Sequence, residues 1–286
     1  MAIKFAYYPG CVVQSSAPEV DEAMRAIAPL LGIELIHIPG SSCCGEGVIR
    51  QANNDLQLAL NARNFAIAED SGLEILTSSA SSYGNMWKDL SELNSDDELK
   101  QRINKVLART SDMRFEGTTN MRHLLHVLVD EIGLDKIKSL VVNPIELPVA
   151  AYYGSNLLLP GSCGDDDPWN PTYFESLITA LGGEPIYIDG RTQSVGHTSI
   201  LSQEKTVLKM TAEILNEAIS AGAKVLASAC PFSSIALDNY QIKAGRATNT
   251  DTDIPVIHLP ELIAFALGCY PERFAYLRTR VMVIGT

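Results

Sequence analysis

The sequence predicts an α/β protein of two pseudo-symmetric domains, each with a small parallel sheet flanked by helices. Short apolar strands alternate with amphipathic helices along the chain, which favours parallel sheets with helices outside. The same order of elements occurs twice. Residues at equivalent places in the two copies, here called landmarks, recur at matched spacing. There are 34 residues between Cys44 and Ser79 and also 34 between Val195 and Cys230. We therefore expect residues 1–146 to form the first domain and residues 147–286 the second.

The first half opens with an apolar strand that ends in a tight turn at Cys11. Its first helix is expected between a capping box at Ser16 and a glycine stop at Gly32, with Met24 and Ile27 on the apolar face. The later elements follow in the same alternation. They are strands over residues 34–37 and 73–77, loops over 39–45 and 78–84, helices over 56–70 and 123–133, and a charged helical excursion within 92–118.

The second half repeats this order after a boundary over 143–148, where two prolines separate a helix from the next strand. It differs from the first half by a loop insertion over 161–168. The expected elements are strands over residues 150–153, 185–188 and 224–228, loops over 190–196 and 229–233, and helices over 171–181, 207–221 and 258–268.

Each half places its landmark residues in the turns that follow its strands. They are Cys11, Cys43, Cys44, Ser79 and Ser82 in the first half, and Ser155, Ser194, Val195, Cys230 and Ser233 in the second. Loops at the carboxyl ends of parallel strands converge, so we expect the landmarks of each half to face one site. Six of the ten positions hold a residue other than cysteine.

With these landmarks the chain resembles the CCG-motif family over essentially its whole length. The family includes the B-type subunit of heterodisulfide reductase, thiol:fumarate reductase and members of heterodisulfide-reductase-like sulfur-oxidising complexes. Its members carry two copies of a motif of one cysteine, a Cys-Cys-Gly and a Cys-x-x-Cys. The stretches Tyr7-Tyr8-Pro9-Gly10-Cys11 and Cys43-Cys44-Gly45 carry the resemblance here, together with Tyr152-Tyr153-Gly154, Cys230-Pro231 and Ile257-His258-Leu259-Pro260. The resemblance implies an iron–sulfur cofactor held by a complete cysteine set.

Both halves depart from the family's pattern. Cys230 is the one thiol at the second set of landmarks, and a single cysteine cannot anchor a cluster, so we expect the second site to be empty. Three thiols remain at the first set, and three alternatives stay open for them: an iron–sulfur cluster, zinc, or free thiols without metal. Ser79, Ser82, His123 or a partner chain are the candidates for a fourth ligand.

Composition and charge exclude some classes of partner and indicate the cellular compartment. A net charge of -12 argues against nucleic acid and against an anionic membrane surface. We find no apolar stretch long enough to span a bilayer and no secretory signal, so we expect a cytoplasmic protein. Six cysteines in a reducing compartment are more typical of ligands or reactive thiols than of disulfides.

The preferred function is that of a subunit of a heterodisulfide-reductase-like oxidoreductase complex that acts on thiols, disulfides or sulfane sulfur. The chain's own part is electron relay or thiol handling at Cys11, Cys43 and Cys44, and no catalytic residue is assigned. The resemblance implies partners: a ferredoxin-like iron–sulfur subunit, with or without a flavoprotein subunit, and a sister chain with all its cysteines. The alternative is a non-catalytic scaffold paralogue with a structural metal or none.

Overall fold

The computed structural model describes residues 2–269, and its first half forms one four-stranded parallel sheet in the order β2-β1-β3-β4. The strands are β1 (Ile3–Tyr7), β2 (Ile33–His37), β3 (Ile75–Thr77) and β4 (Met121–His123). The helices are α1 (Cys11–Ser15), α2 (Pro18–Leu31), α3 (Ile49–Ala52), α4 (Asn54–Asp70), α5 (Ala80–Ser95), α6 (Asp97–Thr110), α7 (Leu124–His126), the π-helix η1 (Val127–Ile132) and α8 (Leu134–Ser139).

The second half forms a second parallel sheet, and its order β6-β5-β7-β8 is the same as that of the first. The strands are β5 (Pro148–Tyr152), β6 (Glu184–Ile186), β7 (Val225–Ser228) and β8 (Val256–His258). The helices are α9 (Tyr173–Ala180), α10 (Glu204–Ser220), α11 (Pro231–Asn239), α12 (Gln241–Thr248) and α13 (Leu259–Ala266), with the short 3-10 turns η2 (Asp189–Thr192) and η3 (His197–Ser199). The predicted α/β fold with two small parallel sheets is thus confirmed.

Two of the predicted loops are helix starts. The serine-rich segment 78–84 contains the first turn of α5, because the Ser79 side chain accepts a hydrogen bond from the Ser82 backbone N–H and caps the helix. The segment 229–233 likewise contains the start of α11, with Pro231 in the first turn. The expected capping box at Ser16 is wrong. Helix α2 begins at Pro18 with Ala17 as its N-cap and no side-chain cap.

Each sheet has a fourth strand that the sequence pattern did not indicate. Strands β4 and β8 are three residues long and run directly into the helices that follow them. A short apolar run joined to an apolar helix shows no alternation of its own, so its period cannot distinguish a strand from the first turn of that helix.

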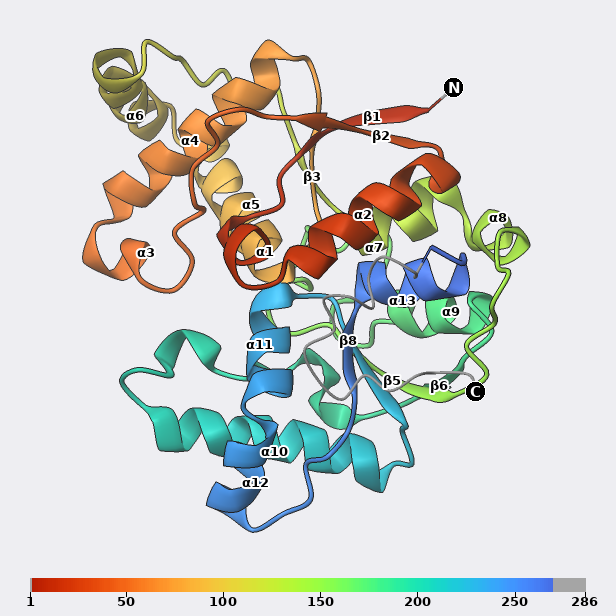
Figure 1. The fold of residues 1–286 in the computed structure, drawn as a ribbon. Coiled ribbons are helices and arrows are strands. Elements are labelled where there is room, and N and C mark those ends of the chain that lie inside the picture. The colour runs from red at the N-terminus through yellow and green to blue at the C-terminus, as the bar shows by residue number, and fades with distance from the viewer. Residues whose placement is uncertain (1, 270–286) are drawn as a thin grey trace.

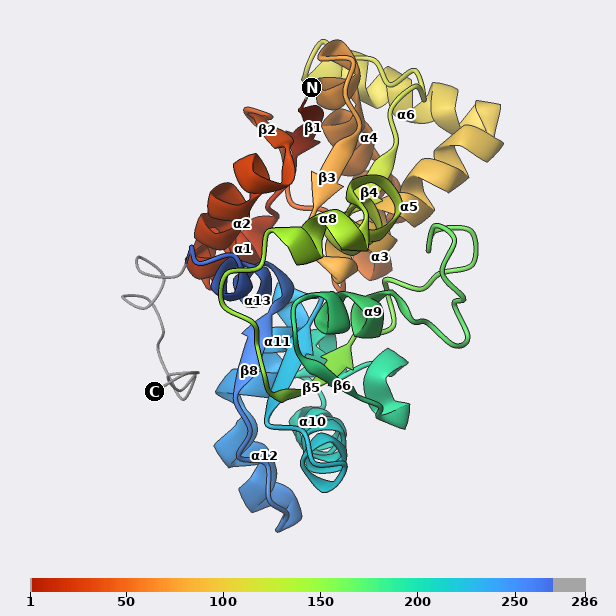
Figure 2. The same cartoon turned by 90° about the vertical axis from the view of Figure 1, so that its right-hand side faces the viewer.

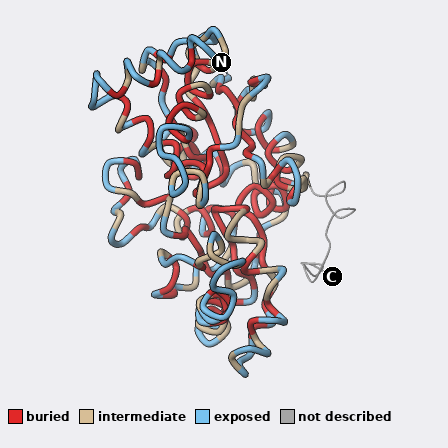
Figure 3. Tube along the Cα trace, turned by 90° about the vertical axis from the view of Figure 1, so that its left-hand side faces the viewer, coloured by how far each residue is buried: buried red, intermediate tan, exposed pale blue. Residues whose placement is uncertain are grey.

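The halves meet where the carboxyl ends of their strands face each other. The backbone N–H of Ala80, after β3, donates to the carbonyl of Ala229, after β7, at 3.1 Å. Helix α13 of the second half packs against α2 of the first, and Figures 1 and 2 show the two helices side by side. Buried segments run from one half into the other (Figure 3). The largest hydrophobic core therefore contains residues of both sheets.

A glycine in α5 marks the closest approach of the halves. A Cβ atom at Gly84 would lie 2.1 Å from the carbonyl oxygen of Asn156 in the second half. We expect Gly84→Ala to lower the free energy of unfolding by about 1–3 kcal/mol, because the backbone of Asn156 must move away. Urea unfolding measures the change, with Ser91→Ala on the exposed side of the same helix as the control. A stabilised Gly84→Ala protein, the usual result inside a helix, would contradict this close contact.

Candidate functional site

The first candidate site lies at the carboxyl ends of β1, β2 and β3. Cys11 begins α1 after a turn in which Gly10 has a φ of 82° and lies against Ser82, whose Oγ would be 3.3 Å from a Cβ. The Tyr8 hydroxyl donates to the carbonyl of Ser42 at 2.8 Å. The end of β1 is therefore tied to the loop that carries Cys43 and Cys44.

This arrangement brings the three thiols of the first half together. The sulfurs of Cys11 and Cys43 lie 3.4 Å apart, and both residues are exposed. Cys44 is buried, and its thiol donates to Ser82 Oγ at 3.6 Å. The three cysteines line a cavity of about 50 Å³ together with Ser79 and Ser82. All five landmarks of the first half thus face one site.

Hydrogen bonds within the site favour negative charge on one sulfur. The neighbouring thiols of Cys11 and Cys44 and the Gly45 backbone N–H, which donates to Cys43 Sγ at 3.4 Å, together lower the pKa of Cys43. The interaction with Cys43, reinforced by burial, raises the pKa of Cys11 and of Cys44. Because the thiolate is the form that binds metal and attacks electrophiles, Cys43 is the most reactive of the three.

The second candidate site repeats this construction with one thiol, that of Cys230. The Tyr152 hydroxyl donates to the carbonyl of Gln193 at 2.6 Å, just as Tyr8 does to Ser42. Gly154 has a φ of 71° and lies against Ser233, the counterpart of Ser82. A cavity of about 160 Å³ results. It is lined by all five landmarks of the second half, Ser155, Ser194, Val195, Cys230 and Ser233.

The two sites share a wall. Ser81 Oγ lies 3.3 Å from Cys230 Sγ and 3.2 Å from Ser79 Oγ, so a chain of hydrogen-bonding groups joins the first site to the second. Glu46, Ser81 and Phe232 line both cavities. None of these three was singled out from the sequence. The signal that was available is their position, two residues after a landmark cysteine for Glu46 and Phe232 and between two landmark serines for Ser81.

The histidines near the sites differ in what they can bind. Both ring nitrogens of His123 are engaged, Nδ1 by the Leu125 N–H at 3.2 Å and Nε2 with the carbonyl of Ala229 at 3.2 Å. This ring is therefore not available as a fourth ligand of the first site. His197 lies in the wall of the second cavity, with its ring edge-on to Phe232 at 4.4 Å between centroids.

The ligand atoms of the first site are of the type that binds a soft metal or an iron–sulfur group. Three thiols, one of them with a lowered pKa, line the same cavity, and thiolates are the ligands of iron–sulfur clusters and of many zinc sites. Over residues 2–269, however, no three His, Cys, Asp or Glu side chains are already grouped as a metal site.

The remaining cysteines are not part of either site. Cys163 is buried, and its thiol donates to the carbonyl of Asp166 at 3.2 Å. Cys269 follows α13 and packs at the edge of the core. Within residues 2–269 we find no helix with the length and apolar character that crossing a bilayer demands.

Comparison with known proteins gives consistent matches. A family model described as a cysteine-rich domain, CCG, matches residues 5–86, which include all five landmarks of the first site. The chain is 35% identical over 270 residues to the 8-methylmenaquinol:fumarate reductase membrane anchor subunit of Wolinella succinogenes, covering 94% of this chain and 93% of that one. It is 31% identical over 282 residues to a protein of Archaeoglobus profundus described as like the B-type subunit of heterodisulfide reductase, covering 96% and 93%.

Two further matches are another relative and a solved structure. The B-type subunit of the ferredoxin/F420H2-dependent CoB-CoM heterodisulfide reductase of Methanosarcina acetivorans is 30% identical over 275 residues, covering 94% of this chain and 91% of that one. Among solved structures, a hypothetical protein from Helicobacter pylori aligns with a TM-score of 0.75 at 15% identity. That alignment covers 93% of this chain and 49% of the other, and it shows the fold alone.

Proposed function

Because the chain belongs to the CCG family, with the B-type subunit of heterodisulfide reductase and its relatives, we propose that it passes electrons through a single thiol site in an oxidoreductase complex. The complex acts on thiols, disulfides or sulfane sulfur in the cytoplasm. Its other members are a ferredoxin-like iron–sulfur subunit, with or without a flavoprotein, and a sister chain that keeps all its cysteines.

One observation carries this proposal: Cys11, Cys43 and Cys44 line one cavity, with the Cys11 and Cys43 sulfurs in contact. An iron–sulfur group bound there would accept and give back one electron at a time. The chain's own residues supply the ligands, and the Gly45 N–H stabilises charge on the Cys43 sulfur. Ser79 and Ser82, which stand where the family has cysteines, leave part of that group without thiolate ligands.

The second site has no part in electron relay under this proposal. Cys230 is its one thiol, and serine hydroxyls remain protonated and bind iron poorly. We also infer that the halves, residues 1–146 and 147–286, descend from one duplicated unit. The shared strand order and the paired tyrosine hydrogen bonds of Tyr8 and Tyr152 support that origin.

Anoxic purification followed by iron, sulfide and zinc analysis tests the proposal. We expect iron and acid-labile sulfide bound in a fixed ratio to the chain, with visible absorption that changes on reduction. Zinc without sulfide would instead support a scaffold paralogue with a structural metal. A colourless, metal-free chain in an active complex would overturn electron relay. The scaffold alternative draws its support from the serines at both sets of landmarks.

A further inference from the structure

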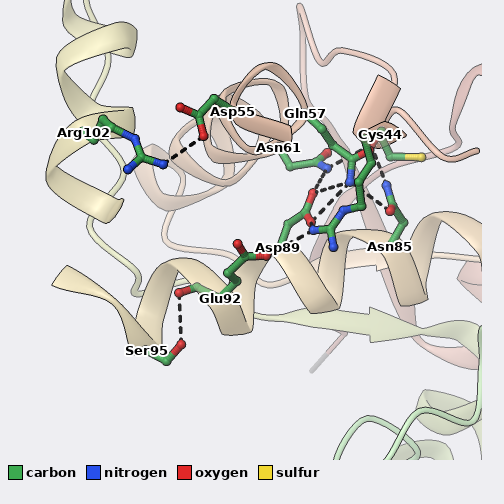
Figure 4. Close-up of polar contacts among 10 residues, drawn as sticks. Cys44, Asp55, Gln57, Asn61, Asn85, Asp89, Glu92, Ser95 and Arg102 are labelled. Atoms are coloured by element: carbon green, nitrogen blue, oxygen red, sulfur yellow. Dashed lines mark hydrogen bonds and ion pairs between the residues drawn. The ribbon is translucent and has the colours of Figure 1, made fainter. Parts of the chain in front are cut away.

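A buried group of amide side chains holds the peptide that follows Cys44. The carbonyl of Cys44 accepts hydrogen bonds from Asn61 Nδ2 at 2.9 Å and from Asn85 Nδ2 at 2.6 Å. The two asparagines come from α4 and α5, so two separate helices converge on one carbonyl oxygen (Figure 4).

The other side of the same peptide faces the thiol site. The Cys44 carbonyl and the Gly45 N–H belong to one planar group, and that N–H donates to Cys43 Sγ at 3.4 Å. Fixing the carbonyl in the amide pocket therefore fixes the direction of the N–H. Gly45 has a φ of 80°, and a Cβ there would lie 3.2 Å from Gln57 Cγ, so both backbone and space require glycine.

Asp89 holds Asn61 directly and Asn85 through Gln57. Asn61 Nδ2 donates to Asp89 Oδ2 at 2.6 Å, and Gln57 Nε2 bridges Asp89 Oδ2 and Asn85 Oδ1, each at 3.0 Å. Arg50 donates to the other carboxylate oxygen. Gln57, Asn61 and Asp89 are fully buried.

A buried polar network of this size needs a reason, because apolar side chains of similar volume would pack there at less cost. Burial raises the pKa of Asp89, and the hydrogen bond from Asn61 and the charge of Arg50 oppose that shift. Asp89 is paired with Arg50, and as a carboxylate it accepts from Asn61 and Gln57 at once.

The second half provides an internal comparison. Helices α4 and α10 have the same length, and their fourth and eighth residues are Gln57 and Asn61 in α4 but Val207 and Thr211 in α10. Six and ten residues after Ser79 stand Asn85 and Asp89, whereas Ala236 and Tyr240 stand at these intervals after Cys230. The second half, whose site keeps only the thiol of Cys230, therefore has no counterpart of the network at these four positions.

We propose that Asn61, Asn85 and Asp89 are positioning residues that direct the Gly45 N–H at the Cys43 sulfur. Through that hydrogen bond they set the reduction potential of the group the site holds. The inference rests on the proposed function for the identity of that group. Hydrogen bonds to sulfur stabilise the reduced, more negative state, so losing one lowers the potential.

Hydrogen exchange of the Gly45 amide tests the positioning directly in the metal-free full chain. We expect Asn85→Leu and Asp89→Asn each to speed this exchange tenfold or more, as measured by NMR. Asn104→Leu is the matched control, because Asn104 holds the backbone of Phe115 in the same way elsewhere in the first half. Unchanged exchange at Gly45 in both variants, or equal acceleration in the control, would overturn the inference.

A second readout uses the metal-loaded protein. The midpoint potential should move to lower values in Asn85→Leu and Asp89→Asn and stay unchanged in Asn104→Leu. Equal potentials in all three would contradict the role in setting the potential. If the unaltered chain binds no iron but Gly45 exchange still responds, the positioning inference stands and the proposed function fails. The two failures are therefore distinguishable.

Discussion

If the proposed iron–sulfur group is present, replacing Cys43 with alanine is expected to remove the bound iron and sulfide and to abolish the visible absorption. The Cys43 sulfur is the centre of the site, since it contacts Cys11 Sγ and receives the Gly45 N–H, both at 3.4 Å. Without it the site keeps one exposed thiol and one buried thiol bonded to Ser82. Two thiolates are fewer than an iron–sulfur cluster normally requires.

Iron and sulfide per chain after anoxic purification measure this effect. We expect a fall of roughly tenfold or more, because loss of a ligand costs at least as much as loss of the groups that support it. Cys269→Ala is the matched control, since its thiol lies away from both cavities. Full iron content in the Cys43→Ala protein would show that the metal is held elsewhere.

The second large effect expected is acid destabilisation from two buried histidines. Burial lowers the pKa of His126 to about 4 and that of His258 to about 3. In the unfolded chain both rings take up a proton near pH 6.5. Between pH 6.5 and about pH 4 the unfolded state therefore binds more protons than the folded state. The free energy of unfolding falls as the pH is lowered through that window.

Each ring contributes a slope that approaches about 1.4 kcal/mol per pH unit below its unfolded pKa, so the two together remove about 3 kcal/mol between pH 6.5 and pH 5. Urea unfolding at a series of pH values measures this loss. Buried carboxyl groups such as Asp89, whose pKa burial raises, act in the opposite direction. The comparison with His126→Leu isolates one histidine, because that variant should lose about 1.4 kcal/mol per pH unit of the slope. An identical slope in both proteins would refute the assignment.

Much of the fold could be predicted because its signals are local. The strand at 73–77 and the helix stops at Gly32 and Gly222 follow from apolar period and glycine, and both glycines have a positive φ, 78° and 92°. The landmark spacing also placed each set of five residues in one cavity. The starts of α5 and α11 were missed, because serine and proline occur in turns as often as in a first helical turn.

Contacts between elements far apart in the sequence could not be predicted in the same way. Ser81 meets Cys230 across 149 positions of sequence, and Asn61 and Asn85 meet at the Cys44 carbonyl from separate helices. Nothing in the period of a single helix indicates which polar residue on its buried face will find a partner. Such residues are identified only once the helices are packed.

The packing of α13 on α2 has a consequence for the order in which the chain folds during synthesis. Met24, Ile27 and Leu31 of α2 share one core with Leu262, Ile263 and Ala266 of α13, more than two hundred residues later. A ribosome needs on the order of tens of seconds to make that stretch. Throughout this time α2 can pack only against elements of the first half such as α1 and β2, and the part of its apolar surface that α13 covers stays exposed. The first half therefore completes its core only after α13 has emerged.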